Sequence, residues 1–411
     1  MRTQQFIELF PIFEGTKVNG KPLVYFDNAA TSQRPRSVMD RVSQMSLKGN
    51  ANIHRAVHTL SSIATDAYEE SRDAARIFLN AASREEIIFT SGTTAAINLV
   101  AYSFTERYVK AGDEIIVGEA EHHSNFVPWQ LAAARRGAKV IYLPMGDDGL
   151  YDLSELDSLI TPSTKLVCIG HASNVLGIVN PVREFVSVCH AHGVPVLVDG
   201  AQGAAHQTVD VQDMDCDFYA FSAHKLFGPT GVGVLYGKRK YLEEMPPFMS
   251  GGEMVGTVSL EHTDFAALPY KFEAGTQNFN SVAALKPALE LMESVLADKE
   301  LRAEFETTKA WLYNALTAIP GLTMYGTVGD VPMECKLPVF SFTVEGAHHE
   351  DLAILLDKMG LAVRSGQMCA EPLMNHFGVT GMVRASLMPY NTLQEAEYFV
   401  ESLNRAIRML K

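Results

Sequence analysis

Val194-Pro-Val-Leu-Val-Asp-Gly-Ala-Gln202 and Phe218-Tyr-Ala-Phe-Ser-Ala-His-Lys225 are the two stretches of sequence that decide the fold. Each begins as a short apolar run typical of a buried strand, and each reaches a charged residue, Asp199 or Lys225, where that run ends. A charge at the end of a buried strand loses water, which is unfavourable unless another group compensates it. We therefore expect Asp199 and Lys225 to share one ligand that satisfies both.

Pyridoxal phosphate meets this requirement. Its aldehyde condenses with a lysine, and its ring nitrogen must stay protonated beside an acid to act as an electron sink. At about 4 Å and an effective dielectric constant near 20, such an acid–pyridinium pair is worth roughly 4 kcal/mol before desolvation. The ordinary alternative is an aspartate in a turn and a solvated lysine.

Apolar runs alternate with helix-period stretches from about residue 24 to residue 240. Examples of the runs are 87–89, 114–117, 139–143, 165–169, 194–198 and 233–236, and residues 66–79 have a helical pattern. This alternation predicts an α/β fold with a mostly parallel sheet covered on both faces. In such sheets ligands bind beyond the carboxyl ends of the strands, which is where Asp199 and Lys225 fall.

The C-terminal third has a different pattern. A helical stretch over 281–296 contains Pro287, which should start or kink the helix. A strand over 338–344 and helices over 350–359 and 393–410 then predict a smaller α+β domain. We expect an N-terminal segment (1–22) packed on the small domain, a large cofactor-binding domain (23–293) and the small domain (294–411).

Composition excludes several classes of protein. The 411 residues carry a formal charge of −14, which disfavours a nucleic-acid partner, and no window approaches the ~18 apolar residues of a membrane span. The first ten residues lack a secretory signal, so we expect a cytoplasmic protein. Five cysteines without C-x-x-C pairing indicate free thiols rather than disulfides or structural zinc.

The predicted strand at 87–89 is followed by Thr90-Ser-Gly-Thr-Thr94, which begins a helix. The unpaired N–H groups at the start of a helix, together with a glycine, favour the binding of a phosphate. Simple N-capping is the alternative. Ser222 and His224 flank Lys225 and could reach the same anion, so together with Thr93 and Thr94 they predict a phosphate cup.

Histidines occur in two places of interest. His54 and His58 have an i, i+4 spacing, but Arg55 follows the first of them where a zincin needs glutamate, so we discount a metal. His122 suits an imidazole that stacks on the cofactor ring and moves a proton, and a packed, hydrogen-bonded histidine is the competing interpretation.

Cys369 lies in a polar, turn-like segment, Val363-Arg-Ser-Gly-Gln-Met-Cys369, which favours an accessible thiol over a buried one. A nucleophilic cysteine needs cationic or dipolar help, and Arg364 is one candidate helper. Arg384 is a candidate for a forked contact with the carboxylate of an amino-acid substrate, with a surface ion pair as its alternative.

These residues together resemble the class V, fold-type I pyridoxal-phosphate enzymes, and more closely the SufS-type (group II) cysteine desulfurases. The resemblance covers nearly the whole chain and rests on ordered motifs: Tyr25-Phe-Asp-Asn-Ala-Ala30, Asn52-Ile-His-Arg55, Glu121-His-His-Ser-Asn-Phe-Val-Pro-Trp129, His171-Ala-Ser-Asn-Val-Leu-Gly177, Val198-Asp-Gly-Ala-Gln202, Asp217 to Lys225 and Phe272-Glu-Ala-Gly-Thr276.

The resemblance implies a role for each candidate. Lys225 would bond covalently to the cofactor, Asp199 would pair with its ring nitrogen, Gln202 would bind its phenolic oxygen and His122 would stack on its ring. The phosphate would be held by Thr93, Thr94, Ser222 and His224, joined by Thr276 from a second subunit, which implies a homodimer. Asn174, Arg364 and Arg384 would orient the substrate, and Cys369 matches the nucleophile.

The implied reaction converts L-cysteine to L-alanine through a Cys369 persulfide, which a SufE- or SufU-like acceptor would take toward iron–sulfur cluster assembly. Two departures stand out: Gln367-Met368 replaces the histidine that often precedes the cysteine, and Ser250-Gly-Gly252 replaces three glycines in a segment resembling a hook between subunits. A selenocysteine lyase and an aminotransferase or epimerase of the same fold are the enzymatic alternatives. An assembly scaffold is the non-enzymatic one.

Overall fold

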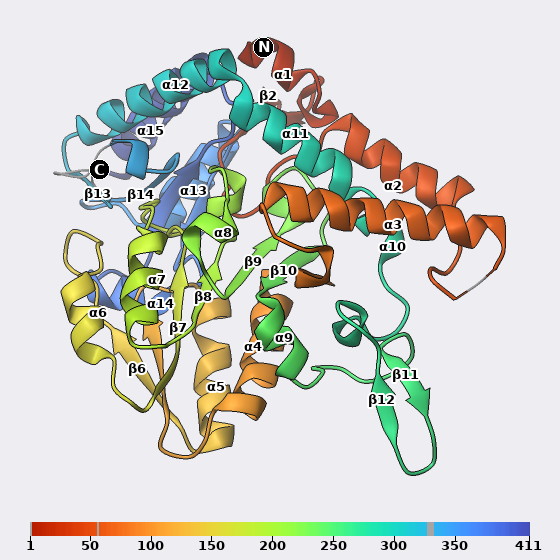
Figure 1. Cartoon of the computed structure of the whole chain (residues 1–411). Coiled ribbons are helices and arrows are strands. Elements are labelled where there is room, and N and C mark those ends of the chain that lie inside the picture. The colour runs from red at the N-terminus through yellow and green to blue at the C-terminus, as the bar shows by residue number, and fades with distance from the viewer. Residues whose placement is uncertain (1, 56, 327–332) are drawn as a thin grey trace.

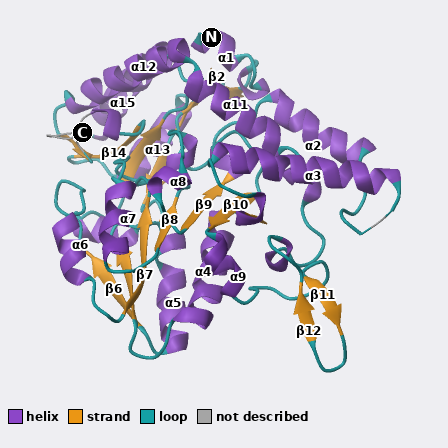
Figure 2. Ribbon diagram, in the orientation of Figure 1, coloured by secondary structure: helices purple, strands orange, loops and turns teal. Residues whose placement is uncertain are grey.

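A seven-stranded sheet forms the centre of the computed structural model, which describes residues 2–55, 57–326 and 333–411 (Figure 1, Figure 2). Its strand order is β4-β10-β9-β8-β7-β5-β6. The strands are β4 (Ile87–Thr90), β5 (Glu114–Gly118), β6 (Lys139–Leu143), β7 (Thr164–Gly170), β8 (Val196–Asp199), β9 (Phe218–Ser222) and β10 (Gly233–Gly237).

All pairs from β9 to β6 are parallel, whereas β10 runs antiparallel to both of its neighbours, β4 and β9. The expectation of a mostly parallel α/β sheet is therefore confirmed, and the strand predicted at 233–236 is the one that reverses direction. Because β4 is antiparallel to β10, its carboxyl end lies at the same edge as those of the parallel strands.

Helices cover both faces of this sheet because alternate strand residues point to opposite sides. Ile88, Leu197 and Leu235 belong to the core beneath α4 (Thr93–Tyr108) and α5 (Val127–Arg136). Val196 and Val198 belong to the opposite core. That core is covered by α3 (Thr59–Phe78), α6 (Leu153–Leu159), α7 (Val182–Ala191) and α11 (Leu285–Ala297).

The predicted helix over 281–296 is two helices, α10 (Phe279–Val282) and α11. Pro287 lies in the first turn of α11, where its missing N–H has no intrahelical partner to lose. The proline thus acts near the start of the helix, as expected.

An antiparallel four-stranded sheet of order β13-β14-β17-β16 organises the C-terminal part. Its strands are β13 (Leu322–Tyr325), β14 (Val339–Val344), β16 (Arg364–Gly366) and β17 (Met382–Ser386). It packs with α12 (Lys299–Thr317), α13 (His349–Lys358) and α15 (Leu393–Leu410) around a third core. The helix α14 (Glu371–His376) follows Cys369.

The N-terminal residues contact this C-terminal part. The Thr3 N–H of α1 (Thr3–Ile7) donates to Glu304 on α12 at 2.9 Å, and β3 (Val24–Tyr25) pairs with β15 (Leu361–Ala362). The proposed division at residues 22/23 and 293/294 stays a prediction.

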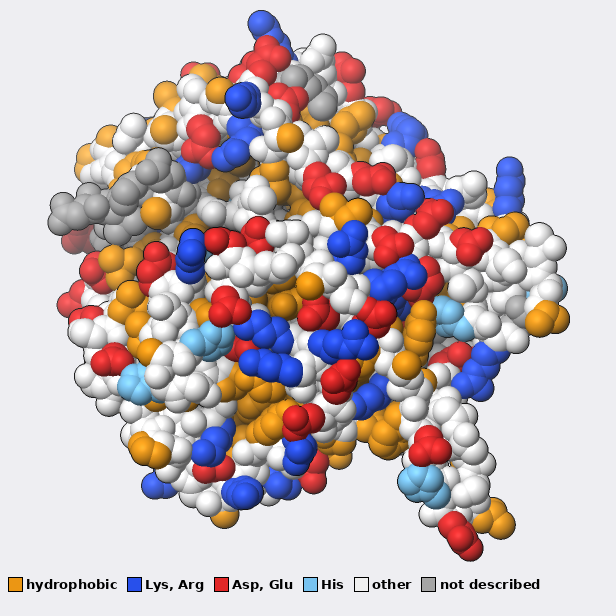
Figure 3. All heavy atoms as spheres, viewed as in Figure 1, with side chains coloured by type: hydrophobic (Ala, Val, Ile, Leu, Met, Phe, Trp, Pro, Cys, Tyr) orange, Lys and Arg blue, Asp and Glu red, His pale blue; other side chains and the backbone are white. Residues whose placement is uncertain are grey.

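The remaining elements are short strands and surface helices: β1 (Lys17–Val18), β2 (Lys21–Pro22), α2 (Arg36–Lys48), α8 (Val211–Met214), α9 (Arg239–Glu244), β11 (Val255–Val258) and β12 (Thr263–Phe265). The β11–β12 hairpin projects well away from the body of the molecule (Figure 1, Figure 3). Among the described residues, no helix combines the length and apolar composition needed to cross a membrane.

Candidate active site

One pocket of about 570 Å³ lies at the carboxyl ends of the parallel strands, a size typical of small-molecule sites. It is lined by every predicted site residue except one: Thr93, Thr94, His122, Asn174, Asp199, Gln202, Ser222, His224, Lys225, Arg364, Cys369 and Arg384. The exception is Thr276, which is exposed and lies outside this chain's pocket. The predicted residues that line this pocket therefore come from two parts of the chain, residues 93–225 and residues 364–384.

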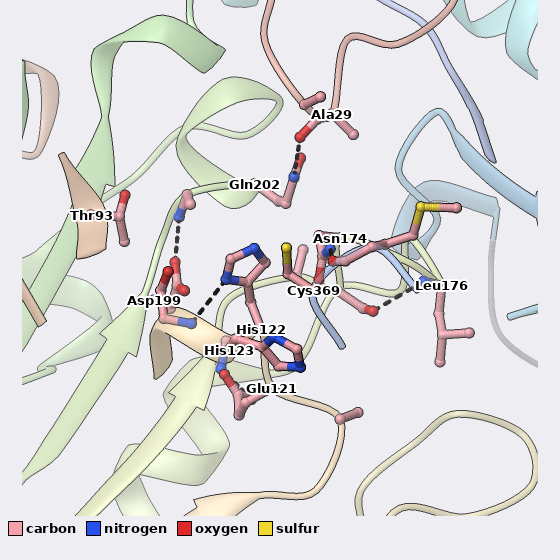
Figure 4. Close-up of a pocket in the computed structure, with 18 of the residues that line it drawn as sticks. Ala29, Thr93, Glu121, His122, His123, Asn174, Leu176, Asp199, Gln202 and Cys369 are labelled. Carbon is pink, nitrogen blue, oxygen red and sulfur yellow. Dashed lines mark hydrogen bonds between the residues drawn. The ribbon is translucent and has the colours of Figure 1, made fainter. Parts of the chain in front are cut away.

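Asp199 and Lys225 are placed by neighbouring strands, since Asp199 ends β8 and Lys225 follows the end of β9. Asp199 is 7% exposed, and its Oδ1 accepts a hydrogen bond from the Ala201 N–H at 2.9 Å (Figure 4). Burial raises the pKa of Asp199, opposed by the nearby Lys225 cation. Burial lowers the pKa of Lys225 to about 8, against the pull of Asp199. The two charges thus share one pocket and influence each other.

Gln202 lies in the turn that follows β8. Its Nε2 donates to the Ala29 carbonyl at 2.9 Å, while its buried Oε1 has no hydrogen-bond partner among the described residues. A buried polar atom without a partner is unusual and indicates a missing group. The orphan oxygen is an acceptor and lies in the pocket wall with Asp199 and Lys225, so these groups fit a ring that bears both a basic nitrogen and a hydroxyl substituent.

Three of the residues predicted to hold a phosphate, Thr93, Thr94 and Ser222, lie together at the N-terminus of α4. Ser222 Oγ accepts from the Thr93 N–H at 2.7 Å and lies 2.7 Å from Thr93 Oγ1, and Thr94 Oγ1 lies 2.7 Å from Ser124 Oγ. Gly92 caps the helix with φ 152°, a conformation that favours glycine. Hydroxyls from three strand ends therefore surround the positive end of a sixteen-residue helix.

Two histidines of the pocket are held in the neutral form. Burial, followed by the Lys225 charge, lowers the pKa of His122 to about 3 and that of His224 to about 4. His122 Nδ1 accepts from the Ser124 N–H at 3.0 Å, so its ring proton is on Nε2. This bond fixes the orientation of the ring in the pocket.

Arg384 on β17 is 3% exposed, which excludes the surface ion pair considered for it. Its Nη1 donates to the Asn174 carbonyl at 2.9 Å and its Nη2 lies 3.3 Å from Asp27 Oδ1. Arg364 Nη2 forms an ion pair with the other oxygen of Asp27 at 2.9 Å. Two arginines therefore converge on one carboxylate at the edge of the pocket, a pattern suited to holding a second, incoming carboxylate.

Cys369 is the exposed cysteine of the described set, and it lines the pocket. Cys168, Cys189 and Cys216 are buried and Cys335 is half-buried, and all are free thiols as predicted. The two histidines discounted as metal ligands serve structural purposes: His58 caps α3 through the Ser61 N–H, and His54 lies 3.7 Å from Glu69.

Sequence reasoning missed Glu121 and Asp27. Glu121 is buried behind His122, where it accepts from the Gly170 N–H at 2.8 Å and from Asn125 Nδ2 at 2.6 Å. Burial raises its pKa to about 8. Both residues lie inside motifs given above: Glu121 directly precedes His122, and Asp27 belongs to the motif at residues 25–30. Their place in these motifs was the available signal.

The fold and the pocket together define a class of protein. A model of the family described as aminotransferase class-V matches residues 24–399, and the chain belongs to this family. Pyridoxal 5'-phosphate is the cofactor of its cysteine desulfurases and of this chain, in agreement with the donor set described above.

Relatives within the family narrow the comparison. The chain is 43% identical over 405 residues to a probable cysteine desulfurase of Halalkalibacterium halodurans, with 98% of each chain covered. It is 44% identical over 402 residues to a cysteine desulfurase of Escherichia coli, covering 98% and 97% of the two chains. Among solved structures, the cysteine desulfurase CsdA (S-sulfonic acid) of Escherichia coli matches with a TM-score of 0.89 and 38% identity over both whole chains. An apo cysteine desulfurase of Thermococcus onnurineus matches with a TM-score of 0.92 and 35% identity, covering 100% and 99% of the two chains.

Proposed function

We propose that this protein is a cysteine desulfurase that converts L-cysteine to L-alanine and keeps the sulfur as a persulfide on Cys369. The observation that carries the proposal is that an exposed thiol lines the same pocket as the half-buried Lys225 and the buried Asp199. An aminotransferase or epimerase has no use for that thiol. An assembly scaffold has no use for this paired amine and acid in the pocket.

The cofactor supplies an electron sink for the substrate Cα. Lys225 is the residue that bonds to it, and Asp199 holds the proton on its ring nitrogen. With a pKa of about 8, the Lys225 amine is partly neutral near physiological pH and can take a proton from the substrate Cα and return one. Gln202 and His122 hold the ring, and the hydroxyls of the phosphate cup hold its phosphate.

On the substrate side, Arg384 and Asn174 orient the cysteine carboxylate. The Cys369 thiolate attacks the substrate sulfur, so an S–S bond forms while the substrate Cβ–S bond breaks and its electron pair goes to carbon. Protonation of that carbon gives alanine. In sum, L-cysteine and one Cys369 thiol give L-alanine and one Cys369 persulfide.

The test compares holoenzymes carrying Cys369→Ser and Cys335→Ser. We expect Cys369→Ser to lose alanine formation and the mass gain of one sulfur atom per chain, whereas Cys335→Ser keeps both because that residue lies outside the pocket. Alanine formation from cysteine at the wild-type rate by Cys369→Ser would refute the nucleophile. Loss with cysteine but retention with selenocysteine would favour the lyase alternative.

A homodimer with shared sites is the second part of the proposal. Thr276 is exposed outside this chain's pocket, and the projecting β11–β12 hairpin presents the exposed side chains of Val258, Leu260 and Phe265. Both observations favour a second copy of the chain that packs against Thr276 and the β11–β12 hairpin. Light scattering of the holoenzyme should give twice the chain mass. A mixed dimer of one Thr276→Ala chain and one Lys225→Ala chain should load cofactor normally in one of its two sites, whereas a Thr276 that served its own chain's site would leave no intact site.

We also propose a dedicated sulfur acceptor of the SufE or SufU kind, serving iron–sulfur cluster assembly. Cys369 follows β16 after only Gln367 and Met368, so the thiol has little chain with which to travel. An acceptor must then dock at the pocket mouth. Turnover measured with and without such a protein tests this directly, and equal rates would contradict it.

A further inference from the structure

The backbone at the nucleophile is held in an unusual conformation. Met368 and Cys369 have φ values of 53° and 56°, so two consecutive residues with side chains occupy the left-handed region. Each such residue is strained, and strain of this kind persists only where surrounding contacts over-determine it. The question is which contacts hold Cys369 in this conformation.

The residue before the cysteine is held by packing and by Asn174. The Met368 side chain is buried in an apolar cluster that includes Val175 and Leu373. The Asn174 Nδ2 donates to the Met368 carbonyl at 2.8 Å. These contacts leave Cys369 and the start of α14 to be positioned by other groups.

His123 makes the next two contacts. Its backbone N–H donates to the Cys369 carbonyl at 2.7 Å, and its Nε2 accepts from the Glu371 N–H, the first residue of α14, at 3.1 Å. The α14 N-cap, Ala370, has no side-chain cap of its own, so the imidazole caps the helix from another part of the chain. Figure 4 shows His123 beside His122, with Cys369 on the same side of the pocket.

We propose that His123 is a positioning residue for the nucleophile: its two hydrogen bonds, here called the clamp, hold Cys369 in place at the wall of the pocket. This inference rests on the proposed desulfurase function. The His123 ring does not act on the substrate. Because Nε2 accepts, the ring proton must be on Nδ1, and only a side chain that presents an acceptor at the Nε2 position can replace it. Glutamine does so, whereas asparagine reaches only as far as Nδ1.

The experiment uses four holoenzyme variants: His123→Ala, His123→Asn, His123→Gln and, as a matched control, His192→Ala. His192 is a surface histidine paired with Asp157 on α6, far from Cys369 in the chain. The first readout is amide hydrogen exchange of peptides that span residues 367–373. The second is the single-turnover rate of persulfide formation, with cofactor content and the spectral change on adding cysteine recorded in parallel.

We expect His123→Ala and His123→Asn to lose exchange protection at 367–373 and to form the persulfide roughly tenfold more slowly or worse, since a displacement of about 1 Å can cost more than that. His123→Gln and His192→Ala should stay near the wild type. Cofactor content and the cysteine-induced spectral change should be unaltered in all four.

Wild-type protection and persulfide rate in His123→Asn would overturn the clamp, and so would a His123→Gln variant as slow and as unprotected as the asparagine variant. If His123→Ala does not fold, the asparagine–glutamine comparison decides the matter alone. Should the wild-type protein form no persulfide, the proposed function fails, but the exchange measurement still decides whether His123 holds the loop.

Discussion

Glu273 and Arg72 form a buried pair whose disruption should be measurable as lost stability. Arg72 on α3 and Glu273 are almost fully buried, and Arg72 Nη1 and Nη2 donate forked hydrogen bonds of 2.7 and 2.9 Å to the Glu273 carboxylate. Glu273 accepts two further bonds, from the Phe89 N–H at 2.7 Å and from the Tyr68 hydroxyl at 2.8 Å. The carboxylate therefore faces four donors.

The perturbation is Glu273→Gln, which keeps the shape and removes the charge. Each carboxylate oxygen accepts from two donors, so an amide NH₂ group meets two donors whichever way it is turned. The variant also removes the more deeply buried of the two carboxylates that pair with the Arg72 cation and leaves only Glu69, whose Oε2 lies 3.0 Å from Arg72 Nε. Breaking a buried pair in this way costs about 3–5 kcal/mol. For a chain of this length that corresponds to a melting temperature lower by about 4–6 °C.

The assay is urea unfolding followed by circular dichroism, with thermal unfolding in parallel. The matched control is Glu70→Gln, on the same helix as Arg72, where Glu70 forms an exposed ion pair with Lys286 at 3.0 Å. We expect that control to lie within about 1 kcal/mol of the wild type. A Glu273→Gln protein as stable as Glu70→Gln would refute the reasoning.

Three further predictions concern the pocket. Burial lowers the pKa of Lys225 to about 8, so the neutral fraction of its amine increases with pH. The rate at which the apoprotein bonds to pyridoxal phosphate should therefore rise up to about pH 8 and then level off. Stopped-flow absorbance measures this rate, and a rate that stays constant between about pH 6 and 8 would contradict the prediction. Burial raises the pKa of Glu121 to about 8 from its ordinary 4.5, so its contribution to stability is present at low pH and lost as pH rises through about 8. Between about pH 5 and 8, the free energy of unfolding should therefore fall less in Glu121→Gln than in the wild type. Urea unfolding at both pH values measures this, and an equal fall in the two proteins would count against the prediction. An alanine at Gly233 would place its Cβ 2.4 Å from Gly92 Cα. Gly233→Ala should therefore lose about 1–3 kcal/mol of stability in thermal unfolding and release the cofactor faster on dialysis. Cofactor retention equal to that of the wild type would contradict the close approach.

Local pattern was enough to predict the centre of the site. Asp199 and Lys225 end apolar runs, and the carboxyl ends of strands in such a sheet lie along one edge, so their meeting could be anticipated from sequence order alone. The strand at 139–143, the apolar run at 218–221 and the helix at 393–410 likewise follow from periodicity, and the structure extends the second of these by one residue, to Ser222. The roles given to these residues remain predictions.

Contacts between distant segments could not be predicted in the same way. Asp27 and Arg384 are joined by an ion pair although more than 350 residues separate them, and no local pattern encodes such a partner. The direction of β10 also escaped the pattern, because an apolar run reads the same in parallel and antiparallel strands. The burial of Glu121 depends on Gly170, which belongs to another strand.

The reversed strand β10 has a consequence for biosynthesis. It lies between β4 and β9, so the Thr93 and Ser222 hydroxyls reach one another across a strand that the ribosome makes after both of them. A nascent chain that stops short of residue 237 therefore lacks the completed arrangement of hydroxyls that we propose as the phosphate cup. Arg384 and Cys369 arrive later still. The vitamin-derived prosthetic group must consequently be captured late in translation or after release, and truncated products of this gene should emerge colourless.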